Sequence, residues 1–142
     1  MSTPTREEML AALEKRQGVD AVRKLQASTV AVCGLGGLGS NIAISLARAG
    51  VGKLILIDFD CVDVTNLHRQ QYKANQVGLP KPEALLANLK EVAPYAEFET
   101  HFEKVTTENA AALLAKADVV CEAFDNAEAK AMLVKTVLET MP

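Results

Sequence analysis

The chain has 142 residues and a mass of 15.2 kDa, enough for one globular domain and too little for two. Apolar residues make up 49% and charged residues 23%, which excludes disordered, collagen-like and disulfide-rich classes. Fifteen Lys and Arg against eighteen Asp and Glu give a net charge of -3. That balance lacks the cationic excess of proteins that bind nucleic acids or membrane surfaces, so we expect neither partner.

The cysteines and the N-terminus indicate a cytoplasmic protein. Cys33, Cys61 and Cys121 are an odd number at wide spacing, and they form no C-x-x-C pair, so no zinc is expected in this chain. A reducing compartment suits free thiols. The first residues lack the basic and apolar regions of a secretion signal. The uncharged stretch 25–47 is long enough to cross a bilayer, but its four glycines and its polar residues argue against a membrane helix.

The first part of the chain predicts an N-terminal helical segment over residues 1–28. Thr5 and Glu8 match a capping box, which predicts a helix that begins there and runs to about Gln17, with Gly18 as its stop. A second short helix is expected over 20–25. We therefore divide the chain into this segment and a domain over residues 29–142.

The remaining chain alternates between strand and helix patterns. The apolar run 29–33 is typical of a strand buried on both faces, and a helix follows the glycine loop, with Ile42, Leu46 and Ala49 on one side and a break at Gly50. The segment 59–80 is predicted as a long loop with at most one helical turn, near 66–69. The further elements expected are strands at 53–58, 97–102 and 118–123 and helices opening at Pro82, about 109–115 and 127–140.

This order predicts an α/β fold. Strands that alternate with helices need right-handed crossovers, which give a Rossmann-like, doubly wound and mostly parallel sheet covered by helices on both faces. Four strands make a small sheet, so we interpret the chain as a truncated form of a larger domain, incomplete at its C-terminus.

A glycine-rich loop lies between the first predicted strand and its helix. Gly34, Gly36, Gly37 and Gly39 allow backbone N–H groups to approach an anion, and the N-terminus of the following helix adds partial positive charge. This context indicates a phosphate or nucleotide site. The alternative is a tight turn without a ligand.

Asp58 ends the second predicted strand, 24 residues after Gly34. An acidic side chain at this place commonly accepts hydrogen bonds from ribose hydroxyls, which favours a nucleotide over a bare phosphate. The alternative is a solvated carboxylate at the end of a strand. Up to this point a dehydrogenase that binds a nicotinamide cofactor explains the pattern equally well.

Cationic residues further along favour a triphosphate. Asn66 and Arg69 are three apart, so on a helical turn they share one face, and the guanidinium of Arg69 suits phosphate oxygens. Lys81 immediately precedes Pro82 at a predicted helix start, where the helix dipole disfavours a cation unless an anion is bound. Simple solvation of each cation is the alternative.

Asp125 and Asn126 follow the fourth predicted strand. If the first and fourth strands flank the crevice of a doubly wound sheet, Asp125 faces the glycine loop and can hold Mg²⁺ beside a polyphosphate. The alternative is that Asp125 and Glu128 only cap the last helix. The two roles do not exclude one another.

Taken together, these motifs resemble a known family. The runs Gly34 to Gly39, Leu56 to Asp60, Asn66 to Gln70, Pro80-Lys81 and Phe124 to Asn126 stand in the order typical of the ubiquitin-activating-enzyme-like superfamily, and the chain is similar to the ThiF-type adenylyltransferases of thiamine biosynthesis. The resemblance implies an ATP·Mg²⁺ site. In it Asp58 holds the ribose, Asn66, Arg69 and Lys81 contact the phosphates, Asp125 coordinates the metal, and Asn126 belongs to the nucleotide site.

The resemblance also implies partners and a reaction. Arg16-Gln17 is similar to an N-terminal pair whose arginine reaches the phosphates of the partner subunit in a homodimer. The implied substrate is a small ubiquitin-like sulfur carrier, whose C-terminal carboxylate attacks the α-phosphate of ATP and releases pyrophosphate. Two alternatives stay open, an NAD(P)-dependent oxidoreductase and a catalytically silent scaffold or dimerisation domain. Further strands, zinc-binding C-x-x-C pairs and a catalytic cysteine, which many family members carry, are not found in this sequence.

Overall fold

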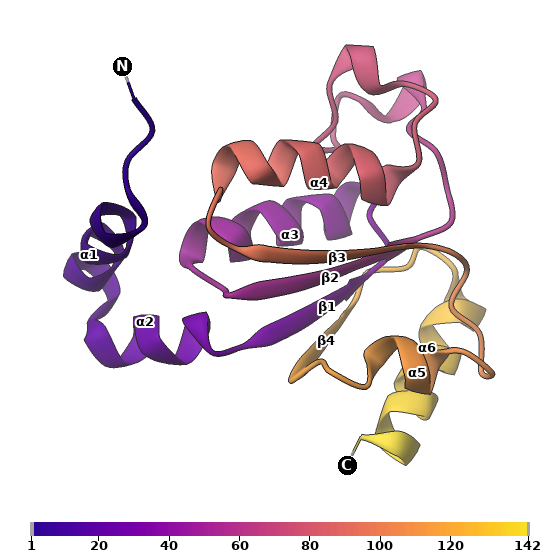
Figure 1. The fold of residues 1–142 in the computed structure, drawn as a ribbon. Coiled ribbons are helices and arrows are strands. Elements are labelled where there is room, and N and C mark those ends of the chain that lie inside the picture. The colour runs from indigo at the N-terminus through magenta and orange to yellow at the C-terminus, as the bar shows by residue number, and fades with distance from the viewer. Residues whose placement is uncertain (1, 142) are drawn as a thin grey trace.

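The computed structural model describes residues 2–141, which form a four-stranded sheet with helices on both faces (Figure 1). The strands are β1 (Thr29–Cys33), β2 (Lys53–Asp58), β3 (Glu97–Phe102) and β4 (Val119–Glu122). Every pairing is parallel and the strand order is β3-β2-β1-β4. The predicted doubly wound α/β fold is therefore confirmed.

Side chains along the central strands β1 and β2 point alternately to the two faces of the sheet and form a separate hydrophobic core on each face. Because successive side chains of a strand point to opposite faces, Val32 and Leu56 pack under α3 (Gly37–Ala49) and α4 (Lys81–Val92), whereas Cys33 and Ile57 face α5 (Ala110–Leu114) and α6 (Ala127–Thr140). All four side chains are fully buried. A sheet covered on both faces requires the unbroken apolar runs seen in β1 and β2.

The N-terminal helices lie where β1 begins, at the end of the sheet opposite to its carboxyl edge (Figure 1). They are α1 (Arg6–Gln17) and α2 (Val19–Gln26). The predicted capping box is present: the Thr5 hydroxyl accepts from the backbone N–H of Glu8 at 3.1 Å, and the Glu8 carboxylate accepts from the N–H of Thr5 at 3.0 Å. Gly18, with φ of +91°, ends α1 as expected. No described helix is long and apolar enough to span a bilayer.

Three predicted boundaries were wrong. First, α3 begins at Gly37, so the last three residues of the predicted glycine loop form the first helical turn. Second, the segment 59–80 contains two 3-10 turns, η1 (Val64–Asn66) and η2 (Ala74–Gln76), where one at 66–69 was expected. Third, Lys81 is itself the first residue of α4 and Pro82 the second. Neither glycines nor polar residues carry a periodic apolar signal, which explains the first two errors.

Candidate functional site

A cleft of about 400 Å³ opens at the carboxyl ends of β1, β2 and β4. The next strand in the chain, β2, pairs with one edge of β1, and β4 pairs with the opposite edge. The cleft therefore lies at the point where the strand order reverses. Ligands bind at this point in open α/β sheets. The cleft is lined by eight of the predicted site residues: Gly34, Gly36, Gly37, Asp58, Asn66, Arg69, Lys81 and Asp125.

The glycines shape the floor of this cleft. Gly34 has φ of +95°, and its N–H donates to Ile57 at 2.9 Å. A side chain at Gly34 would meet the carbonyl oxygen of Ala123 at 2.8 Å, so β1 and β4 approach each other closely only because this residue is glycine. Gly36 precedes α3, and no side chain among the described residues caps that helix end. The first backbone N–H groups of α3 thus remain available to an anion.

Asp58 is fixed beneath the glycine loop. One carboxylate oxygen accepts from the N–H of Leu35 at 2.6 Å and the other from the N–H of Asp60 at 2.8 Å, and only 7% of the residue is exposed. The alternative of a solvated strand-end carboxylate was therefore wrong. Each carboxylate oxygen has a second lone pair, so Asp58 retains capacity to accept from a hydroxyl in the cleft.

Arg69 lies over the N-terminus of α3. Its Nη2 donates to the side chain of Asn66 at 3.4 Å, and its Cζ is 3.5 Å from where a Cβ at Gly37 would be. As the spacing predicted, Asn66 and Arg69 meet. A cation at a helix N-terminus is unfavourable, because the helix dipole places partial positive charge there. An anion between Arg69 and α3 would remove this conflict.

Lys81 supplies the second cation of the cleft. The residue is 6% exposed, its backbone N–H donates to Asp60 at 2.9 Å, and its side chain lines the cleft. Within residues 2–141 its ammonium group forms no ion pair. A lysine that buries its stem and has no carboxylate within ion-pair distance in the described part of the chain is suited to hold an anionic ligand.

A network of amides holds the loop that carries Arg69. Asn88 of α4 donates to the carbonyl of Gln71 at 2.9 Å, and the Ser40 hydroxyl of α3 accepts from the N–H of Gln71 at 3.1 Å. The Tyr72 hydroxyl donates to the carbonyl of Leu35 at 2.6 Å. Burial and the nearby charge of Asp58 raise the pKa of Tyr72, so it remains a donor. The loop is therefore anchored to both neighbouring helices and to the glycine loop.

Asp125 and Asn126 have different roles in the structure. Asn126 caps α6, and its side chain accepts from the N–H groups of Glu128 at 2.8 Å and Ala129 at 3.0 Å. The alternative in which Asp125 and Glu128 cap the last helix was wrong, because the cap lies one residue later, at Asn126. Asp125 is exposed and lines the cleft, so its carboxylate is available to a ligand.

A second hollow of about 380 Å³ continues from the cleft on the side of α6. The two share Asp58, Phe59, Phe124 and Asp125, and Asn126 lines the second one. This hollow is more apolar than the cleft. We did not predict its remaining walls from the sequence: Ile57, Glu103, Lys104, Val105, Thr106, Glu128, Ala129 and Met132. The one available signal was that Phe59 and Phe124 each follow the end of a strand at the cleft.

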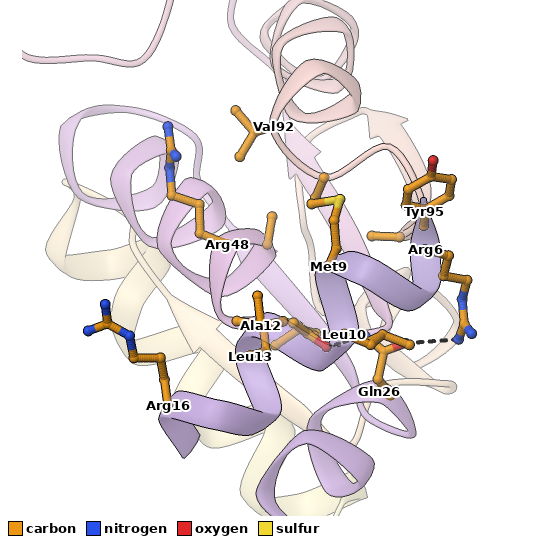
Figure 2. A pocket seen from close by; sticks show the side chains of 15 residues that line it. Arg6, Met9, Leu10, Ala12, Leu13, Arg16, Gln26, Arg48, Val92 and Tyr95 are labelled. Atoms are coloured by element: carbon orange, nitrogen blue, oxygen red, sulfur yellow. Dashed lines mark hydrogen bonds between the residues drawn. The ribbon is translucent and has the colours of Figure 1, made fainter. Parts of the chain in front are cut away.

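Arg16 and Gly39 do not line the cleft. Gly39 lies within α3, packed on the carbonyl of Gly34. Arg16 lies on α1 beside a different cavity of about 420 Å³, between α1 and the ends of α3 and α4, where Arg6 and Arg48 also border apolar walls (Figure 2). This chain therefore does not bring its own Arg16 to its own cleft.

The cleft has two exposed carboxylates, those of Asp60 and Asp125. Residues 2–141 contain no group of three or more His, Cys, Asp or Glu side chains able to hold a metal on their own. Mg²⁺ bound to a polyphosphate needs only one or two protein carboxylates, because phosphate oxygens and water supply the other ligands. Asp125 beside a phosphate cradle fits that requirement. Cys33 is buried, Cys121 is half-buried and Cys61 is exposed.

Comparison with known sequences finds one family over nearly the whole chain. The ThiF family model matches residues 9–140. The chain is 42% identical over 117 residues to the adenylyltransferase and sulfurtransferase MOCS3 of Anopheles gambiae, which covers 82% of this chain and 26% of that protein. It is 43% identical over 98 residues to ubiquitin-like modifier-activating enzyme 5 of Caenorhabditis elegans, which covers 69% of this chain and 23% of that protein. The chain thus spans about a quarter of the length of these relatives.

Solved structures show the same fold. The E. coli tRNA N6-threonylcarbamoyladenosine dehydratase TcdA, solved in complex with ATP, superposes with a TM-score of 0.89 at 28% identity. The match covers 97% of this chain and 58% of TcdA. A second structure of TcdA, in complex with AMP, matches equally well, with a TM-score of 0.89.

Proposed function

The chain belongs to the ThiF family, and from this we propose that its cleft binds ATP and transfers the adenylyl group to the C-terminal carboxylate of a small ubiquitin-like sulfur carrier protein. The observation that carries the proposal is the joined pair of hollows at the strand ends. The polar hollow offers the helix N-terminus, Arg69 and Lys81 to phosphates, and the apolar hollow offers Phe59 and Phe124 to a base. Asp58 lies between them, where a ribose would stand.

The comparisons support ATP as the nucleotide. TcdA, which shares this fold, has been solved with ATP and with AMP. Arg69 and Lys81, which form no ion pair within the part of the chain that the structure describes, and the α3 terminus are more positive charge than the diphosphate of a nicotinamide dinucleotide requires, so we place the oxidoreductase second. Asp125 would hold Mg²⁺, which supplies charge neutralisation at the phosphates.

The reaction needs little proton transfer from the protein. The α-carboxyl group has a pKa of about 3.3 to 3.7 in peptides, so at neutral pH it is already ionised and nucleophilic. One carboxylate oxygen forms a bond to the α-phosphorus, and the bond between the α-phosphorus and its bridging oxygen to the β-phosphate breaks. Pyrophosphate leaves with the electron pair of that bond. Arg69 and Lys81 stabilise the charge that develops on it, which is positioning and electrostatic catalysis.

Several finer points belong to the same proposal. The names of the relatives, an adenylyltransferase and sulfurtransferase and a ubiquitin-like modifier-activating enzyme, support a carrier protein as substrate. We assign the carrier to the ThiS-like class of thiamine biosynthesis in the cytoplasm, on the resemblance of the site motifs. We also propose a homodimer in which Arg16 reaches the partner's phosphates, and a division into residues 1–28 and an ATP-binding domain over 29–142.

Pyrophosphate exchange tests the proposal. The chain is incubated with ATP, Mg²⁺ and labelled pyrophosphate, with and without a purified ThiS-like carrier. We expect carrier-dependent exchange that is lost in Arg69→Ala and in Asp125→Ala and retained in two matched surface variants, Arg23→Ala and Asp20→Ala.

Parallel titrations distinguish the alternatives. Tight binding of NADH without a response to ATP would favour the oxidoreductase, and carrier binding without exchange would favour a silent scaffold. Normal exchange in both cleft variants would overturn the assignment of the cleft. Exchange with a molybdopterin-type carrier alone would overturn the ThiS-like assignment and leave adenylylation intact.

A further inference from the structure

Two glutamines of the same loop are equally buried, but the side-chain oxygen of one has hydrogen-bond partners and that of the other has none. Gln70 and Gln76 are each 7% exposed. The Gln76 carboxamide is fully used: its oxygen accepts from the N–H of Lys73 and from Asn88, both at 2.9 Å, and its nitrogen donates to the carbonyl of Ala84 at 3.1 Å and to Asn88 at 2.9 Å. The oxygen of Gln70 is enclosed and has no hydrogen-bond partner within residues 2–141.

An unpaired buried amide is unusual and costly. Most buried polar side-chain atoms in folded proteins have a partner, and an unsatisfied one costs the desolvation energy of the group. Rotation about the last side-chain bond exchanges the oxygen and nitrogen of a carboxamide, and in the orientation present the enclosed oxygen has no partner. The protein holds Gln70 in this state although its neighbour Gln76 is completely paired.

Gln70 is held at the phosphate end of the cleft. It lines the cleft next to Arg69, and its Nε2 is 3.7 Å from where a Cβ at Gly36 would be, beside the N-terminus of α3. Its backbone is fixed, because its N–H donates to Asn66 at 3.1 Å and its carbonyl accepts from Tyr72 at 2.9 Å. The side chain is therefore directed to the place where the glycine loop and Arg69 would hold an anion.

We propose that Gln70 is a nucleotide-binding residue whose carboxamide hydrogen-bonds the polyphosphate above Gly36. Its amide nitrogen donates to a phosphate oxygen. This inference rests on the proposed ATP site and adds a neutral donor to its two cations. A neutral donor contributes directional contact without adding positive charge, which would otherwise hold back the release of pyrophosphate.

The test compares Gln70→Leu with Gln76→Leu. Each change replaces a carboxamide by an apolar side chain of similar volume. Replacing an unpaired buried amide is nearly neutral or stabilising, so the urea midpoint of Gln70→Leu should equal or exceed that of the wild type. Gln76→Leu removes both side-chain hydrogen bonds between Gln76 and the buried amide of Asn88, so it should lower that midpoint.

Calorimetric titration of the same proteins tests the contact. We expect Gln70→Leu to bind ATP and inorganic pyrophosphate about 10- to 100-fold more weakly, the effect of losing a hydrogen bond to a charged group, and to bind adenosine as the wild type does. Gln70→Glu should weaken ATP binding further, because it places a negative charge beside the phosphates.

The possible failures are distinguishable. If Gln70→Leu binds ATP like the wild type while Arg69→Ala does not, the role of Gln70 is overturned and the ATP site stands. A marked loss of stability in Gln70→Leu with unchanged ATP affinity would assign Gln70 a structural role and also overturn the inference. If the wild type binds neither ATP nor pyrophosphate, the proposed function and this inference both fail.

Discussion

Gly39 is packed directly against the carbonyl oxygen of Gly34, so that a side-chain carbon at position 39 would overlap that oxygen. This contact joins the first turn of α3 to the end of β1. It explains why the helix begins within a run of glycines although glycine is a poor helix former. The N-terminus of α3 reaches the cleft floor only because residue 39 carries no Cβ.

Gly37 differs from Gly39 in what surrounds it, and the two alanine variants should differ accordingly. At Gly39 an added methyl group meets backbone, and overpacking of this kind costs about 1 to 3 kcal/mol or more. At Gly37 it meets the guanidinium of Arg69, the mobile end of a side chain. Urea unfolding should show a clear loss of stability for Gly39→Ala and none for Gly37→Ala, which should instead bind ATP more weakly.

A double-mutant cycle checks the cause in Gly37→Ala. If the methyl group acts by displacing Arg69, it should have no further effect on ATP affinity in an Arg69→Ala background. Additive losses would mean that Gly37 acts on the nucleotide directly, and unchanged ATP binding in the single variant would contradict the placement of Arg69 over the phosphate cradle.

Much of the fold was predictable from local sequence. The strands at 29–33 and 53–58 are unbroken apolar runs, and the last helix matches its predicted bounds of 127–140, because these patterns express the burial that a two-faced sheet demands. The turn η2 was not predictable. It is held by bonds from Gln76 to Asn88 and Ala84, which are 12 and 8 residues away.

The residues of the site likewise fall into a group that the sequence predicts and a group that it does not. The predicted glycines, polar and charged residues lie near strand ends and helix starts at recognisable spacings, and eight of those residues do line the cleft. Gln70 and the wall of the second hollow from Lys104 to Thr106 were missed. Their position depends on how the loops after β2 and β3 pack across the sheet, and no spacing within the sequence encodes that packing.

Asp58→Asn should weaken both the fold and the nucleotide site. The carboxylate accepts from the N–H groups of Leu35 and Asp60 with different oxygens, and an amide has only one oxygen to offer. Leaving one buried donor unpaired should lower the free energy of unfolding by about 1 to 3 kcal/mol. Urea unfolding measures this loss.

Asp60→Asn is the matched control for that change. Asp60 is exposed, so its substitution should leave the unfolding free energy within about 0.5 kcal/mol of the wild type. Adenosine binding should fall in Asp58→Asn if the carboxylate holds the ribose. Equal stability of the two variants would contradict the conclusion that the Asp58 carboxylate stabilises the fold through its two backbone hydrogen bonds.

Lys81→Met separates the charge of Lys81 from its buried stem. Methionine is unbranched and apolar, so it can occupy the space of the lysine stem while removing a charge that has no ion-pair partner in the described part of the chain. The melting temperature should be unchanged or higher. ATP affinity should fall at least about tenfold, the usual effect of losing a charge-assisted contact.

Lys90→Met on the exposed side of α4 controls for the net charge. Titrations at two salt concentrations give a second readout, because wild-type ATP binding should weaken with salt more steeply than binding to Lys81→Met. Equal affinity and equal salt dependence in wild type and Lys81→Met would place the ammonium group outside the phosphate site.

Cys33 should make the fold sensitive to alkaline pH. Burial in the core, with smaller contributions from Cys121 and Glu122, raises the pKa of the Cys33 thiol from 9.0 to about 12. Between these values the unfolded chain loses this proton and the folded chain keeps it, so unfolding becomes more favourable. Stability should therefore be unaffected by this group below pH 9 and fall by up to about 1.4 kcal/mol per pH unit above it.

Cys33→Ala isolates that contribution from other groups that titrate in the same range. The variant should be less stable than the wild type at pH 7, because it loses buried sulfur, and the difference should shrink steadily as the pH rises above 9. Iodoacetamide at pH 8 offers an independent check: exposed Cys61 should react rapidly, and in Cys61→Ser the labelling of Cys33 should occur only as fast as the protein unfolds. Rapid modification of Cys33 in the folded protein, or a stability difference that stays constant from pH 7 to 11, would contradict its burial as the source of alkaline sensitivity.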